Sequence, residues 1–167
     1  MKKKLYEARD HLMGGISYAL PVIIGGSLVV AVAKIIGFAG GVSNLDDYAQ
    51  TGGFFHYVWM FQNVGWSAIG LLNLVLSGYI AYSIAGKPAL AAGFVGGVLA
   101  STTNAGFLGA VVIGFFAGWI TNKIKNTVKI KGAAASSVPL IILPLLTIGL
   151  TGILMALILG GPLGWIN

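Results

Sequence analysis

The sequence predicts an all-α membrane protein with about five transmembrane helices. Of its 167 residues, 57% are hydrophobic and only 8% are charged, and the mean hydropathy is +0.91. Such values lie outside the range of soluble domains. The few charges are clustered, and long uncharged segments separate the clusters. We therefore expect one membrane domain over residues 1–167, embedded in lipid.

The N-terminal segment carries the first basic cluster. Over residues 2–13, Leu5, Ala8 and Leu12 have helical spacing, with Lys and Arg opposite them. This pattern is typical of an amphipathic helix lying on an anionic membrane surface, and a disordered basic tail is the alternative. A first span over about 12–37 follows, with 22 uncharged residues before Lys34, enough to cross roughly 30 Å of hydrocarbon. This apolar run is too long for a cleavable signal sequence, so we expect a retained, cytoplasmic N-terminus.

The next segment is expected to form an exterior loop and a second span. Residues 38–63 contain several glycines, Asp46 and Asp47, and then a cluster of aromatic residues. We interpret the cluster as a loop that returns through the interfacial aromatic belt. The second span covers about 64–85 and ends at a turn formed by Gly86, Lys87 and Pro88. Lys87 then marks the cytoplasmic side.

Residues 88–122 are uncharged but short for two crossings. These 35 residues compare with about 40 for two helices through 30 Å. We predict two short spans, 88–102 and 105–122, that meet at a polar turn. A partly re-entrant segment shielded by protein is the alternative.

A second basic cluster fixes the predicted orientation. Lys123, Lys125, Lys129 and Lys131 stand close together without an acidic residue, which marks a cytoplasmic loop. The last span, about 136–161, would then place the C-terminus outside. Because the net charge of +6 arises mostly from such flanking residues, no nucleic-acid partner is expected.

Small residues recur at intervals of four in three segments. Such faces allow helix backbones to approach closely in lipid. We expect them to pack within the chain, with an oligomer seam or a substrate path as alternatives, and we expect a homo-oligomer. The three sets are Ala89, Gly93, Gly97 and Ser101; Gly106, Ala110, Gly114 and Gly118; and Gly152, Ala156 and Gly160.

The sequence offers little reactive chemistry. It has no cysteine, and no catalytic residue, metal site or cofactor site can be assembled from it. Asp and Glu are absent from the predicted spans, and Lys34 is expected to extend to the interface. Amides and hydroxyls could bind a neutral sugar, although a structural role is the alternative. The candidate substrate-binding residues are Asn73, Ser101, Thr102 and Asn104, with Thr103 in the same polar turn.

Four segments of the chain form recognisable motifs. They are HLMGGISYALP at 11–21, KPALAAGFVGG at 87–97, GFLGAVVIGFFAG at 106–118, and VPLIILP at 138–144 continuing to GGP at 160–162. Together they resemble the enzyme IIC membrane subunit of the fructose-type phosphoenolpyruvate-dependent sugar phosphotransferase system. The resemblance covers nearly the whole chain in order. Two departures are Ala89, where the family has Gly, and Ala92, where it has Pro.

The resemblance implies the N-terminal half of a subunit that passes a hexose inward for phosphorylation by a cytoplasmic IIB partner. The family's acidic sugar-binding motif lies in a second membrane half, which we expect as a further partner. The alternative is a scaffold half that carries no sugar by itself. From the residues alone, we expect millimolar hexose binding at best.

Overall fold

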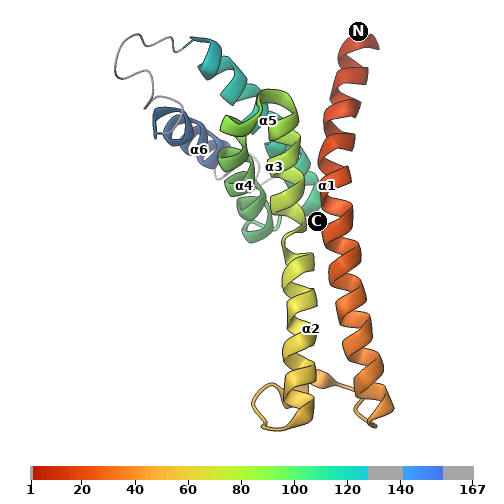
Figure 1. The fold of residues 1–167 in the computed structure, drawn as a ribbon. Helices are drawn as coiled ribbons and strands as arrows, with labels where there is room; N and C mark the ends of the chain where they lie inside the picture. Colours follow the sequence, from red (N-terminus) through yellow and green to blue (C-terminus); the bar gives the residue numbers. More distant parts are fainter. Residues whose placement is uncertain (1, 128–140, 156–167) are drawn as a thin grey trace. The chain divides into compact units, whose positions relative to one another are not determined.

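The computed structural model describes residues 2–127 and 141–155, and the described part of the chain is helical (Figure 1). This confirms the all-α prediction. The elements are α1 (Lys2–Ala39), the 3-10 helix η1 (Leu45–Tyr48), α2 (Phe54–Gly70), α3 (Leu72–Ala85), α4 (Lys87–Thr102), α5 (Gly106–Thr127) and α6 (Leu143–Leu154).

Within the described residues, three helical segments are long and apolar enough to cross a membrane. They are Leu5–Ala39, Phe54–Ala85 and Gly106–Thr127, and α6 is a shorter apolar helix. The 16 residues of α4 span only about 24 Å at 1.5 Å per residue. The count of five crossings therefore stays a prediction.

The N-terminal segment differs from its predicted form. The expected surface helix and first span are one continuous helix, α1, of 38 residues. Pro21 lies inside it without ending it. A helix of this length is about 57 Å long, so it exceeds the hydrocarbon thickness of roughly 30 Å.

The helical region around the second predicted span begins earlier than expected and is interrupted at one point. The aromatic residues expected in a loop belong to α2, which begins at Phe54. The loop ends at the preceding residue, Gly53, which has a φ of 102°. The helix then breaks at Leu71, whose N–H bonds to the carbonyl of Ala68 at 3.1 Å. Helix α3 follows from Leu72 to Ala85, where the prediction placed the end of the span.

The later boundaries agree better with the sequence. Helices α4 and α5 match the predicted 88–102 and 105–122 closely, except that α5 continues to Thr127 and includes Lys123 and Lys125. Asn104, with φ of 56°, lies in the turn between them. Helix α6 falls inside the predicted 136–161. The rest of that span, together with Lys129 and Lys131, lies outside the described residues.

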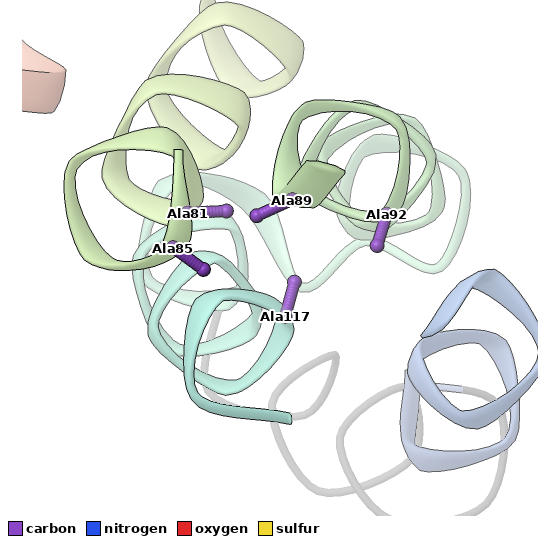
Figure 2. Packing of buried hydrophobic residues seen from close by; sticks show 5 residues of the cluster. All are labelled: Ala81, Ala85, Ala89, Ala92 and Ala117. Carbon is purple, nitrogen blue, oxygen red and sulfur yellow. The ribbon is translucent and has the colours of Figure 1, made fainter. Parts of the chain in front are cut away.

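The helices form two compact units, and α1 contributes to both. Unit 1 comprises residues 1–18 and 73–167, and unit 2 comprises residues 19–72. In unit 1, α3 is buried by its neighbours, with Leu76, Ser77 and Ile80 fully buried. In Figure 2, small side chains from α3, α4 and α5 meet, and Ala81 of α3 points toward Ala89 of α4.

The small-residue faces of α4 and α5 both pack on α3, as the sequence analysis expected. A Cβ atom at Gly93 would lie 2.7 Å from the Cα atom of Gly78, and one at Gly114 would lie 2.9 Å from the carbonyl oxygen of Ser77. These faces are therefore used within unit 1. On α6, by contrast, a Cβ atom at Gly152 would meet no described atom within 4 Å.

Unit 2 is built from the second part of α1, the loop with η1, and α2. Ala33, Val42, Leu45 and Val58 form its buried cluster. The two helices approach closely where Gly26 meets Gly65. This packing fixes the loop against the helix ends.

Candidate functional site

Two of the predicted substrate-binding residues meet in unit 1. Asn73 lies in the first turn of α3 and Ser101 in the last turn of α4. The Asn73 Nδ2 atom donates a hydrogen bond to Ser101 Oγ at 2.9 Å. Gly97 makes this approach possible, because a side chain there would overlap the backbone of Asn73 and Leu74. The Ser101 hydroxyl in turn donates to the carbonyl of Gly97 at 3.3 Å.

The two threonine hydroxyls of the polar turn donate hydrogen bonds to the backbone. The hydroxyls of Thr102 and Thr103 donate to the carbonyl of Leu99, at 3.2 and 2.7 Å. Asn104 occupies the left-handed position of the turn. The structure therefore joins Asn73 to Ser101 and uses the two threonine hydroxyls within α4.

Two further hydroxyls, which are not among the predicted substrate-binding residues, lie in the interior of unit 1. Ser77 on α3 and Thr151 on α6 are fully buried, and neither hydroxyl has a hydrogen-bond partner among the described residues. Thr147, one turn before Thr151, donates instead to the carbonyl of Leu143 at 2.8 Å. No sequence signal marks Ser77 or Thr151, because single small hydroxyl residues are common in membrane helices.

The four polar groups described above for unit 1 are neutral. Asn73, Ser101, Ser77 and Thr151 can donate and accept hydrogen bonds but carry no charge. Such groups can orient a hydroxylated ligand or bind one helix to another, and they cannot serve as an acid or base near neutral pH.

Comparison with known proteins identifies the family. The family described as "Phosphotransferase system, EIIC" matches residues 13–167. This chain belongs to the phosphotransferase system EIIC family. It is accordingly an integral membrane protein, in agreement with its long apolar helices.

Several curated relatives of this EIIC chain are named as fructose-specific components. It is 34% identical to the PTS system fructose-specific EIIABC component of Bacillus subtilis (strain 168), over 91% of the chain and 23% of that protein. It is 37% identical to the PTS system 2-O-alpha-mannosyl-D-glycerate-specific EIIABC component of Escherichia coli (strain K12), over 96% of the chain and 24% of that protein. It is 28% identical to the PTS system fructose-specific EIIC component of Haloferax volcanii, over 100% of the chain and 48% of that protein.

The EIIC chain thus spans less than half the length of each of these relatives. No solved structure matches it. The matched EIIC region includes Asn73, Ser101, Ser77 and Thr151, so these residues belong to the shared part of the family.

Proposed function

We propose that this chain forms the N-terminal half of the membrane component of a fructose-like sugar transporter in the bacterial inner membrane. The observation that carries the proposal is the EIIC match over residues 13–167. The sugar named for several relatives is fructose. The component passes a hexose inward, and a phosphorylated IIB partner phosphorylates it on the cytoplasmic side. Names such as EIIABC and EIIBC among the relatives support a IIB partner.

The proposed topology has five crossings, with the N-terminus inside and the C-terminus outside. Cysteines placed at Ser43, between α1 and α2, and at Thr127, at the end of α5, should therefore react from opposite sides. Because basic residues favour the cytoplasm, Thr127→Cys should be labelled only after permeabilisation, and Ser43→Cys should react with an impermeant maleimide on intact cells. Labelling of both positions from the same side would contradict the five-span topology.

A second candidate function is a scaffold half that folds and oligomerises but moves no sugar by itself. It is favoured by the bond between Asn73 and Ser101, because these two predicted sugar ligands satisfy one another. A homo-oligomer remains part of both proposals. In either case, the remaining membrane half would supply the stronger contacts to the sugar.

A chimaera distinguishes the transport role from the scaffold role. Residues 13–167 would replace the aligned segment of the Bacillus subtilis fructose-specific relative, and phosphoenolpyruvate-dependent fructose uptake would be measured. We expect uptake within roughly tenfold of the parent, a cost of about 1.4 kcal/mol in the rate-limiting step, and none from this chain expressed alone. A chimaera that inserts in full amount but takes up no fructose would contradict the transport role.

A further inference from the structure

Unit 2 contains a small polar pocket near the end of α1, formed entirely within that unit. The pocket has a volume of about 120 Å³ and opens to the surface. Five polar residues, Lys34, Ser43, Asn44, Asp46 and Gln62, line it together with the indole of Trp66. None of them is among the substrate-binding residues predicted from the sequence.

The loop holds Asp46 in a defined position. Asn44 Oδ1 accepts the backbone N–H of Asp46 at 3.2 Å, and Asn44 Nδ2 donates to Asp47 Oδ1 at 3.0 Å. These bonds cap η1 at its start. The side chain of Leu45 is only 5% exposed and anchors the turn in the core of unit 2. The carboxylate is thus presented by a fixed turn.

The amide of Gln62 is the least exposed polar group of the pocket. Its side chain is 4% exposed, and Nε2 lies 3.4 Å from Asp46 Oδ1. Burying an amide costs free energy unless it is hydrogen-bonded, and a contact of 3.4 Å is a long one. An ionised carboxylate has about four acceptor positions, so this contact leaves capacity for hydroxyl donors from a ligand.

Charge and shape narrow the class of ligand. Asp46 and Lys34 carry opposite charges, so these two side chains give the pocket no net charge and no preference for an ion of either sign. Trp66 is 47% exposed and offers a flat apolar wall, with the Lys34 Nζ atom 5.9 Å from its ring centroid. A neutral molecule that has several hydroxyls on one edge and C–H groups on one face fits all three features.

We propose that this pocket binds one edge of a neutral monosaccharide, as a capture site on the outer side of the membrane. Two neighbouring hydroxyls donate to Asp46, Gln62 contacts a third polar atom, and the ring lies against Trp66. The pocket is smaller than the roughly 300–1,000 Å³ of sites that enclose a ligand, so binding is weak. The outward position and the choice of sugar rest on the proposed function; binding itself can be tested apart from it.

The test is a titration of the purified chain in lipid nanodiscs with fructose, followed through the indole N–H signal of Trp66. Trp66→Phe assigns that signal. We expect a saturable shift with a dissociation constant of roughly 1–10 mM. Asp46→Asn should weaken binding by about tenfold, because a charged acceptor forms the stronger hydrogen bonds. Asp10→Asn, which changes an exposed carboxylate of unit 1, should leave it unchanged.

Three results would overturn the proposal. They are a shift that rises without saturation, equal binding by Asp46→Asn and the parent, and a stronger response to inorganic phosphate than to fructose. Each variant is compared with the parent by its circular dichroism spectrum and its other indole signals. If Asp46→Asn fails to fold, Gln62→Met replaces it. This substitution keeps the size of the side chain and buries no charge, and it should also weaken binding. Saturable binding with an inactive chimaera would uphold the pocket and reject the transport role. An active chimaera without binding would reject the pocket alone.

Discussion

Gly97→Leu is expected to prevent stable folding of unit 1. A Cβ atom at this position would lie 2.5 Å from the Cα atom of Leu74 and would overlap the carbonyl group of Asn73. These are backbone atoms of α3, so the side chain of a neighbour cannot rotate away to make room. Overpacking of an interior costs about 1–3 kcal/mol and sometimes more, and leucine adds three further carbon atoms beyond Cβ. We expect Gly97→Leu to lower the free energy of unfolding by an amount at or above the upper end of that range.

The adjacent residue provides the control for Gly97→Leu. Val98 is 45% exposed, and Val98→Leu adds one methylene group on the outer side of α4. Both variants would be purified in detergent and compared by thermal unfolding and size-exclusion chromatography. Gly97→Leu should aggregate or unfold at a much lower temperature, and Val98→Leu should match the parent. Equal melting temperatures would show that α4 does not pack on α3 in this way.

The same reasoning applies to Gly114 of α5, which also packs on α3. A Cβ atom at Gly114 would lie 2.9 Å from the carbonyl oxygen of Ser77 and 3.1 Å from the Cβ atom of Ile80. These distances are longer than those at Gly97, where the Cα atom of Leu74 would lie at 2.5 Å. Gly114→Leu should therefore destabilise unit 1, but less than Gly97→Leu does.

Composition and helical spacing were sufficient to predict the fold class and several boundaries. The turn at Gly86 was predicted because glycine, lysine and proline stand together there, and the structure gives Gly86 a φ of 76°. The small faces of α4 and α5 were predicted as internal packing surfaces, since residues four apart share one side of a helix. Their contacts with α3 confirm this.

The start of α2 and the break at Leu71 could not be predicted in the same way. Aromatic residues are frequent at membrane interfaces whether they lie in loops or in helices, so the cluster after Gly53 did not reveal its helical state. Leu71 is an ordinary helix-forming residue. Its capping bond to Ala68 depends on how α2 and α3 are held, which a local sequence pattern does not contain.

The candidate sites show the same limit. The sequence identified Asn73 and Ser101, and the structure brings them together across 28 positions. It did not indicate that the Thr102 hydroxyl would bond within its own helix. The pairing of Asp46 with Gln62 was also missed, because Asp46 was interpreted only as an exterior charge and Gln62 as part of a loop.

Two neighbouring glycines of α1 should respond oppositely to the same substitution. A Cβ atom at Gly26 would lie 2.8 Å from the carbonyl oxygen of Gly65, and one at Gly65 would lie 2.6 Å from the carbonyl oxygen of Gly26. At Gly25, by contrast, an added Cβ atom meets nothing within 4 Å. The two residues differ by about 100° around the helix axis, so one faces α2 and the other faces outward.

We therefore expect Gly26→Leu to separate α1 from α2 in unit 2 and Gly25→Leu to be tolerated. Gly26→Leu should lower the free energy of unfolding by about 1–3 kcal/mol or more. Gly25→Leu should stabilise the helix by up to about 1 kcal/mol, because leucine has the higher helix propensity. The readout is the melting temperature in detergent, together with the fluorescence of Trp59 and Trp66, which lie on α2. If both variants lose stability equally, Gly25 also lies at a helix interface and the contact between α1 and α2 is wider than the Gly26–Gly65 crossing. If neither does, the two backbones do not meet there, and the polar pocket near the end of α1 would lose the helix pair that supports it.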